Sequence, residues 1–265
     1  MTTSPAVAHS DVFIRRLAVA TERALLLDYD GTIAPFTPDR SKALPYVDVP
    51  QLLDCLISTC HTRVVLISGR AAREIPPLLG LQPCPEIWGS HGLERLAPDG
   101  SYSVARLPKA TTLALSKATA DLRSEGIENL LELKPGCVAV HWRGLGPAYA
   151  QEARTCAYRA LTPIAAGSSE LQLTEFDGGL ELRPRGRNKG SVVRQILAEL
   201  NPDAAVAYLG DDTTDEDAFG ALADRGLTVL VRAEFRPTAA QRWIRPPEEL
   251  VQFLIDWVRA CGGDL

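Results

Sequence analysis

The sequence predicts an α/β fold, in which a doubly wound parallel sheet carries an inserted α+β domain. Short aliphatic runs bounded by turn residues alternate with helix-like segments before residue 106 and again after residue 188. This pattern is typical of parallel strands that are buried on both faces. Between them the chain reads α-β-β-α-β-β with hairpin turns, which indicates an antiparallel sheet backed by two helices. We therefore place the core at residues 1–106 and 185–265 and the inserted domain at residues 107–184.

Composition and charge limit the kind of protein this can be. The 265 residues suffice for one large or two modest domains, and a net charge of −5 argues against nucleic acid or an anionic membrane as the main partner. No apolar run approaches the ~18 residues that a membrane span requires. The six cysteines form no CxxC pair and no zinc-type cluster, which favours reduced thiols. We expect a cytoplasmic monomer that acts on a small molecule.

The first predicted strand, Ala24–Leu27, ends in a short acidic motif that contains Asp28, Asp30, Gly31 and Thr32. Ligands bind at the carboxyl edge of a parallel sheet, and alternate residues of an extended chain share a face. Asp28 and Asp30 should therefore meet in one pocket, where they would repel each other unless a cation or a shared proton separates their roles. The alternative is an ordinary Asp-Gly turn after a buried strand.

The next predicted elements bring a second polar group to the same edge. A loop with Pro35, Pro38, Pro45 and Pro50 precedes a helix over Val49–Cys60 and a strand over Arg63–Ile67. Because such a strand–helix–strand unit is right-handed, it places Ser68 beside Asp28. Ser68 can cap the following helix or contact a phosphate, and both uses remain open. After a third strand, His91 is either a hydrogen-bonding loop residue or a substrate contact.

The inserted domain follows a small hairpin. We expect, in order, a helix, a hairpin, a second helix and a second hairpin turning at Asp177-Gly178, over Pro108–Ser124, Leu130–Arg143, Pro147–Ile164 and Leu171–Arg183. Residues two apart on a strand share a face, so Glu132 and Lys134 project together. The alternative is that they are solvated charges on an exposed sheet face.

The parallel pattern then resumes and supplies more acidic groups. Lys189 opens a helix, and the strand Ala204–Leu209 ends in a loop with Asp211, Asp212 and Asp215; a further strand over Gly226–Val231 and a helix over Glu248–Arg259 close the chain. An EF-hand would need a glycine at its sixth position, which this loop lacks. The acids could simply favour a helix N-terminus. Together with Asp28, however, they carry too much negative charge for a pocket without a divalent cation, and hard oxygen ligands suit magnesium.

Four ordered segments resemble the motifs of haloacid-dehalogenase-type phosphatases: Asp28–Thr32, Ser68–Arg70, Lys189 and Gly210–Asp215. The resemblance implies that Asp28 is the nucleophile that becomes an aspartyl phosphate, and that Asp30 is the general acid and then the general base. It implies that Ser68 and Lys189 hold the phosphoryl oxygens. It also implies Mg²⁺ bound by Asp28, the Asp30 carbonyl and Asp211, with Asp215 and Asp212 in support. Phosphoryl transfer mainly needs such positioning and neutralised charge.

The finer resemblance is to trehalose-6-phosphate phosphatases, and it covers nearly the whole chain. It rests on the segments at residues 28–35, 89–94, 132–134, 141–143, 180–184 and 210–215. It implies a phosphatase that releases trehalose from trehalose 6-phosphate, with the inserted domain as its cap. The substrate-binding residues implied are Arg70, His91, Glu132, Lys134, Glu181 and Arg183.

Several features depart from that family pattern and leave rivals open. They are Pro135-Gly136, Trp142 and the basic run Arg183–Arg187. The rivals are a capped phosphatase for sucrose phosphate or mannosylglycerate phosphate, a phosphomutase, and a non-enzymatic receiver module. A receiver module is far shorter and has no inserted domain, which argues against that last alternative.

Overall fold

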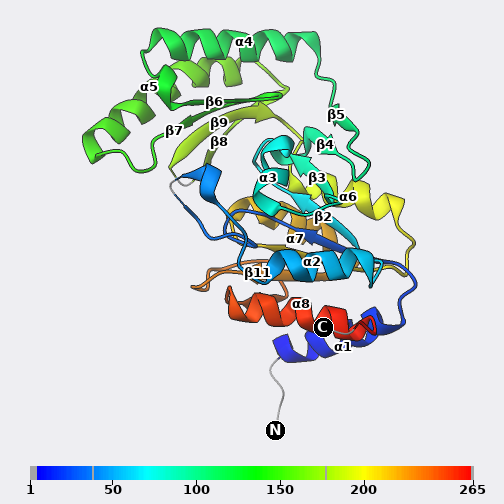
Figure 1. Cartoon of the computed structure of the whole chain (residues 1–265). Coiled ribbons are helices and arrows are strands. Elements are labelled where there is room, and N and C mark those ends of the chain that lie inside the picture. The colour runs from blue at the N-terminus through cyan, green and yellow to red at the C-terminus, as the bar shows by residue number, and fades with distance from the viewer. Residues whose placement is uncertain (1–4, 38, 177, 264–265) are drawn as a thin grey trace. The chain divides into compact units, whose positions relative to one another are not determined.

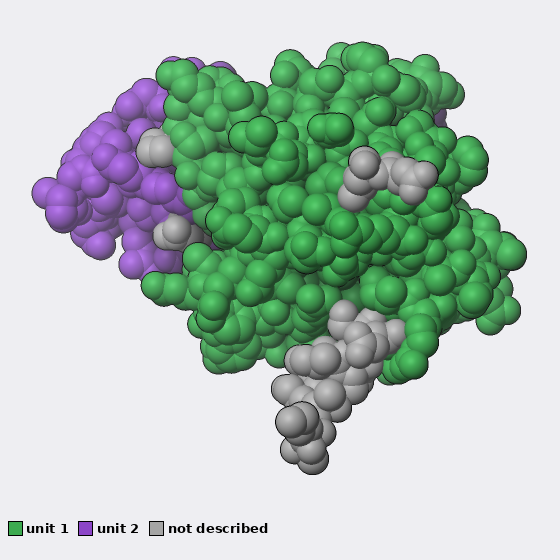
Figure 2. Space-filling model, turned by 60° about the horizontal axis from the view of Figure 1, so that its bottom comes forward, with its two compact units in different colours: residues 1–103, 188–265 green, residues 104–187 purple. Residues whose placement is uncertain are grey.

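The computed structural model describes residues 5–37, 39–176 and 178–263. The chain divides into two compact units, residues 1–103 with 188–265 and residues 104–187, which Figure 2 distinguishes by colour. Pro38 and Asp177, predicted to lie in a loop and in a hairpin turn, fall outside the described residues.

The main sheet has eight strands in the order β12-β11-β10-β1-β2-β3-β4-β5. Figure 1 labels β11, β2, β3, β4 and β5 of this sheet. Neighbours from β12 to β3 are parallel, and β4 is antiparallel to β3. Leu27 of β1 pairs with Leu209 of β10 and Leu66 of β2, so these three strands end together at one edge. The strands are β1 (Arg23–Leu27), β2 (Arg63–Ile67), β3 (Glu86–Gly89), β4 (Glu94–Leu96), β5 (Tyr102–Val104), β10 (Ala205–Gly210), β11 (Leu227–Val231) and β12 (Arg242–Ile244).

Helices cover both faces of this sheet, because its strands are apolar on both sides. Leu25 and Leu27 of β1 belong to one apolar cluster together with Trp257, whereas Leu26 belongs to a second cluster with Phe219. The first cluster lies against α1 (Pro5–Val19), α2 (Val49–Ser58), α3 (Pro76–Leu79) and α8 (Glu248–Ala260), and the second against α6 (Lys189–Glu199) and α7 (Glu216–Leu222). The predicted doubly wound sheet is confirmed.

The second unit is an antiparallel sheet of four strands in the order β6-β7-β9-β8, with two helices. Its own apolar cluster includes Leu122, Val140, Leu161 and Leu182. This confirms the predicted α+β insertion. The elements are α4 (Lys109–Ser124), β6 (Leu131–Lys134), β7 (Cys137–His141), α5 (Pro147–Ala166), β8 (Leu171–Phe176) and β9 (Gly179–Pro184).

A few elements differ from the prediction. Helix α1 begins at Pro5 rather than near Phe13, and β12 was not predicted, because three residues carry too little periodicity. Short 3₁₀ turns also occur, namely η1 (Arg40–Lys42), η2 (Ala72–Glu74), η3 (Ser90–Gly92), η4 (Glu128–Leu130) and η5 (Thr213–Asp215). No helix in the described part of the chain is long and apolar enough to cross a membrane. The six cysteines are free thiols.

Candidate active site

Lys189 joins two buried carboxylates at the carboxyl edge of the main sheet. Its Nζ atom lies 2.7 Å from Asp28 Oδ1 and 2.8 Å from Asp215 Oδ1. The lysine is the first residue of α6, and Asn188 caps that helix by accepting a hydrogen bond from the Ser191 amide at 2.8 Å. The start of α6, the end of β1 and the loop after β10 therefore hold this trio.

The turn after Asp28 brings further groups to the trio. The hydroxyl of Thr32 donates to Asp28 Oδ2 at 3.3 Å. Gly31 has a φ of +86°, and a Cβ atom there would lie 2.3 Å from Asp211 Oδ2. Glycine is therefore required at this position, both for the backbone angle and for the approach of the Asp211 carboxylate.

Asp215 organises the acidic loop that follows β10. Its Oδ2 accepts from the amides of Asp211 and Asp212 at 3.1 and 3.0 Å, and its Oδ1 accepts from the Tyr208 hydroxyl at 2.5 Å. The Asp212 carboxylate instead accepts from the Thr213 amide at 2.7 Å and caps η5. Asp212 thus shapes the loop, and its carboxylate is not part of the buried carboxylate cluster.

Oxygen atoms of Asp28, Asp211 and Asp215 lie within 4.8 Å of one another. Asp211 Oδ1 is buried and has no hydrogen-bond partner among the described residues. Three carboxylates face a single ammonium group here, and burying unneutralised charge is costly. The oxygen donors, the surplus of negative charge and the unpartnered Asp211 oxygen fit a hard metal ion, so this is a metal site.

The charges of the site shift the pKa values of its members. Burial raises the pKa of Asp28 to about 7, although Lys189 pulls it down. Burial, together with Asp28 and Asp215, raises the pKa of Asp211 well above its ordinary value. Burial alone would lower the pKa of Lys189, but Asp215 and Asp28 outweigh it and raise that pKa. The lysine therefore stays charged, while the carboxyl groups of Asp28 and Asp211 need a further cation to ionise fully at neutral pH.

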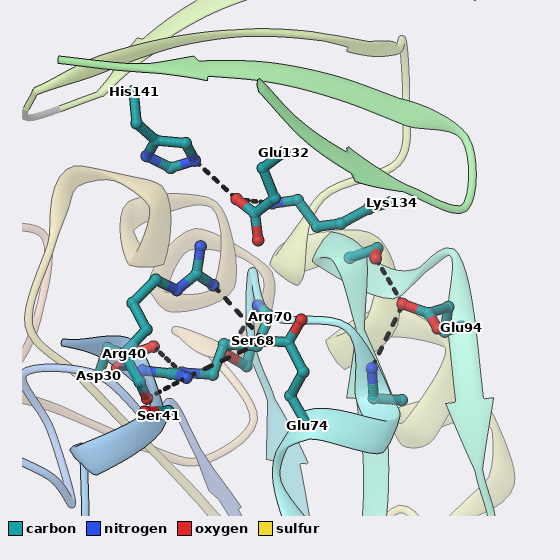
Figure 3. Close-up of polar contacts among 12 residues, drawn as sticks. Asp30, Arg40, Ser41, Ser68, Arg70, Glu74, Glu94, Glu132, Lys134 and His141 are labelled. Atoms are coloured by element: carbon teal, nitrogen blue, oxygen red, sulfur yellow. Dashed lines mark hydrogen bonds and ion pairs between the residues drawn. The ribbon is translucent and has the colours of Figure 1, made fainter. Parts of the chain in front are cut away.

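Arg70 holds Asp30, the second acid of the strand-end motif (Figure 3). Its Nε and Nη2 atoms donate to the two Asp30 carboxylate oxygens at 2.7 and 2.6 Å, and its Nη1 donates to the Arg40 carbonyl at 2.8 Å. The Arg70 side chain is only 2% exposed, whereas that of Asp30 is 28% exposed. The guanidinium of Arg70, which was predicted as a substrate contact, thus pairs with the carboxylate of Asp30.

The loops that contain Ser68 and His91 are joined by backbone hydrogen bonds. Ser68 Oγ accepts from the Arg70 amide at 3.1 Å, and the Ser68 carbonyl accepts from the His91 amide at 3.0 Å. Ser68 does not cap the following helix, since Ala71 occupies the cap position of η2. The Ser68 hydroxyl acts as an acceptor here, which leaves its proton to donate to a ligand.

Glu94 supports this segment, a role that sequence reasoning missed. His91 has a φ of 54° and Ser90 a φ of 48°, both unusual for residues other than glycine. The buried Glu94 carboxylate accepts from the Ser90 hydroxyl at 2.5 Å, the Tyr102 hydroxyl at 2.6 Å and the Ala72 amide at 3.3 Å. The only sequence signal for Glu94 was the family resemblance of residues 89–94. The hydrogen-bond partners of Glu94 come from separate elements, so neighbouring residues in the sequence do not reveal them.

The second unit holds a cluster of charged residues on one face of its sheet. Glu132 and Glu181 both pair in register with Ala139, which places them on the same face. Lys134 Nζ lies 3.4 Å from Glu132 Oε2 and 3.2 Å from Glu181 Oε1.

His141 and Arg183 contact the two glutamates of this cluster. Glu132 Oε2 lies 2.7 Å from His141 Nε2 (Figure 3), and Arg183 Nε lies 4.0 Å from Glu181 Oε2. The side chains of Lys134 and Glu181 are 7% and 4% exposed. They are therefore not the solvated surface charges of the alternative interpretation.

The parallel sheet brings the Asp28–Lys189 pair and the acidic loop to one edge, and solved proteins share this fold. A solved haloacid dehalogenase-like hydrolase from Bacteroides thetaiotaomicron shares this fold, with a TM-score of 0.60 at 17% identity, and covers 89% of this chain and 99% of its own. A family model described as trehalose-phosphatase matches residues 26–242. The chain belongs to the trehalose-phosphatase family.

Named relatives agree with this assignment. The trehalose-phosphate phosphatase of Mycobacterium marinum is 33% identical over 244 residues, which is 87% of this chain and 60% of that protein. A bifunctional trehalose-6-phosphate synthase/phosphatase of Thermoproteus tenax is 32% identical over 215 residues, 81% of this chain and 29% of that protein. The chain thus spans about 60% of the length of the mycobacterial relatives it matches.

Among solved structures, the C-terminal domain of trehalose-6-phosphate phosphatase from Candida albicans has the same fold. Its TM-score is 0.78 at 20% identity, with 96% of this chain and 97% of that chain covered. The likeness therefore extends to the inserted α+β unit as well as to the parallel sheet.

Proposed function

We propose that this chain is a magnesium-dependent phosphatase that hydrolyses trehalose 6-phosphate to trehalose and phosphate, acting as a cytoplasmic monomer. The observation that carries the proposal is the buried Asp28–Lys189 pair, with a second acid, Asp30, two residues further along the chain. This arrangement supplies a nucleophile, a cation for the phosphoryl oxygens and a proton carrier.

In the first step, one Asp28 carboxylate oxygen attacks phosphorus and the bond from phosphorus to the sugar oxygen breaks. Asp30 gives its proton to the departing sugar oxygen, so that trehalose leaves as a neutral alcohol. In the second step, Asp30 takes a proton from water, and that water attacks the acyl phosphate to release phosphate and restore Asp28. Lys189 and Ser68 hold the non-bridging oxygens throughout.

We assign the magnesium ligands to Asp28, the carbonyl of Asp30 and Asp211, with Asp215 and Asp212 in support. The buried carboxylate cluster supports this assignment, since Mg²⁺ prefers a few carboxylates and the oxygens of a phosphate. When bound, the ion neutralises negative charge between the protein carboxylates and the substrate phosphate.

The metal-free protein should lose stability as pH rises. Asp28 has a pKa raised to about 7, so the folded protein holds this proton more tightly than the unfolded chain does. Protonation of Asp28 stabilises the folded protein fully below about pH 4, the ordinary pKa of an aspartate. This stabilisation is lost as the pH rises through about 7. In EDTA, the melting temperature should therefore fall from pH 5 to pH 8.

Mg²⁺ should raise the melting temperature more at pH 8 than at pH 5, because the ligands must be deprotonated to bind it. Asp28→Asn removes the titrating group and serves as the control. In EDTA, the melting temperature of this variant should depend less on pH. A metal-free melting temperature that rises steadily over this range would contradict the assignment.

We further propose that residues 107–184 act as a cap that recognises the sugar, while residues 1–106 and 185–265 form the phosphatase core. The charged cluster of Glu132, Lys134, Glu181 and Arg183 supports this, because paired charges can exchange partners with sugar hydroxyls. We assign a substrate contact to His91 as well.

Substitution of Glu132, Lys134 or Glu181 by Ala should lower kcat/KM for trehalose 6-phosphate by about 5- to 150-fold, corresponding to roughly 1–3 kcal/mol per lost contact. A small aryl phosphate, which has no sugar to recognise, should be hydrolysed at an unchanged rate. Phosphate release from both substrates is the measurement. An equal loss on both would assign these residues to folding, and unchanged rates on both would exclude them from sugar recognition.

The test of the proposed function is phosphate release from a set of sugar phosphates in the presence of Mg²⁺. Trehalose 6-phosphate should be the preferred substrate over sucrose phosphate, mannosylglycerate phosphate and glucose 6-phosphate. Preference for another member of the set would overturn the assigned sugar. Isomerised sugar phosphate without free phosphate would indicate a phosphomutase, and a lasting acyl phosphate without sugar turnover would indicate a receiver module.

A further inference from the structure

Arg236 lies in the segment between β11 and β12 and reaches the acidic loop that follows β10. Its Nε donates to the carbonyl of Asp211 at 3.2 Å, and its Nη2 donates to the carbonyl of Asp212 at 2.7 Å. Its Nη1 contacts Glu216 Oε1 at 2.5 Å and the Pro237 carbonyl at 2.9 Å. One guanidinium group thus binds three residues of the acidic loop and its continuation into α7.

The same segment also fixes Glu216, the residue that anchors Arg236. The Thr238 hydroxyl and the Ala239 amide each donate to Glu216 at 2.8 Å. Burial would raise the pKa of Glu216, but these hydrogen bonds and the one from Arg236 lower it. Glu216 therefore stays ionised, and its charge keeps the guanidinium of Arg236 in place.

The three carboxylates of the metal site are held in different ways. Asp28 is held through its side chain by Lys189 and Thr32, and Asp215 accepts side-chain hydrogen bonds from Lys189, Tyr208 and two amides. Asp211 Oδ1, in contrast, has no partner among the described residues. The Asp211 side chain has a hydrogen bond to Asp28, and the backbone that carries it is held at its carbonyl by Arg236.

We propose that Arg236 is a positioning residue for the metal site and acts through Asp211. By holding two consecutive carbonyls, it fixes the peptide on which the Asp211 carboxylate is mounted and so orients that carboxylate toward the ion. Arg232 adds a weaker contact to the same carbonyl, at 3.4 Å. This inference rests on the proposed magnesium site. Groups that orient metal ligands in this way commonly change metal affinity by about 10- to 100-fold when they are lost.

The test is to titrate Mg²⁺ into Arg236→Lys and Arg236→Met and to measure its dissociation constant by calorimetry and by the metal-dependent rise in melting temperature. We expect the dissociation constant to rise at least about 10-fold in both variants. A lysine keeps the positive charge but cannot bind two carbonyls and Glu216 at once. Arg236→Lys therefore tests the hydrogen-bond geometry even if Arg236→Met folds poorly. Phosphatase activity at saturating Mg²⁺ should recover most of its original value.

Arg63→Met is the matched control. Arg63 lies at the start of β2, at the opposite end of the strand from Ser68, and donates to Glu86 at 2.8 Å and Glu199 at 2.6 Å. Its side chain is 26% exposed, against 17% for Arg236. Loss of Arg63 should lower the metal-free melting temperature and leave the Mg²⁺ dissociation constant unchanged.

The outcomes separate this inference from the proposed function. If the unchanged protein binds no Mg²⁺, the proposed metal is wrong. If the unchanged protein binds Mg²⁺ and both Arg236 variants bind it equally tightly, as the Arg63 control should, the positioning role is overturned. Arg236 would then only stabilise the fold.

Discussion

Asp28→Asn should reduce phosphate release from trehalose 6-phosphate by about 10⁴-fold or more, because an amide cannot form the acyl phosphate. The amide oxygen can still accept a hydrogen bond from Lys189, which now lies 2.7 Å from Asp28 Oδ1. The fold should therefore persist. At pH 8 in EDTA the variant should be at least as stable as the original protein, since one buried negative charge has been removed.

Steady-state phosphate release and thermal melting check this prediction together. The unchanged protein, quenched in acid during turnover, should carry a covalent phosphate that the variant lacks. Asp121→Asn, at a half-exposed position of the inserted unit, is the control and should leave activity unchanged. Retention of the original turnover by Asp28→Asn would rule out the covalent mechanism.

Lys189→Met should destabilise the protein by about 3–5 kcal/mol at pH 8, because it leaves two buried carboxylates without their shared cation. The difference should shrink toward pH 5. Lys189 pulls down the pKa of Asp28, so without the lysine Asp28 binds its proton more tightly when folded, and part of the lost stability returns as Asp28 becomes protonated. Activity should fall as well, because the phosphoryl oxygens lose a cation.

Urea unfolding at pH 8 and pH 5 measures this effect. Lys117→Met is the matched control, since Lys117 Nζ lies 2.6 Å from Asp121 on the surface of α4, with a side chain 65% exposed. Such a pair contributes roughly 0.5 kcal/mol or less. Equal effects of the two substitutions on unfolding would mean that the buried trio does not stabilise the fold as described.

The strand ends could be predicted from the sequence because each buried run is short, aliphatic and followed at once by polar residues. That pattern located Asp28, Ser68 and the acidic loop at one sheet edge. Hairpin turns and a change of period likewise delimited the inserted unit. These signals are local, because each depends only on residues that are neighbours in the sequence.

The partners of these residues could not be predicted, because they come from distant parts of the chain. Nothing in the sequence distinguishes Arg70 or Arg236 from the other basic residues as the group that binds Asp30 or the Asp211 carbonyl. Tyr208, within a buried strand, reads as a core residue, yet its hydroxyl donates to Asp215. The position of the candidate site was thus predictable, and the groups that hold its residues were not.

The apolar cluster of the inserted unit draws all its members from residues 107–182. Among the residues that the structure describes, this cluster shares no side chain with the two clusters of the main sheet. Substitutions on the four-stranded sheet can therefore accumulate without disturbing the packing beneath Asp28 and Lys189. Proteins that descend from one ancestral enzyme could therefore change their substrate sugar while they keep the same chemistry.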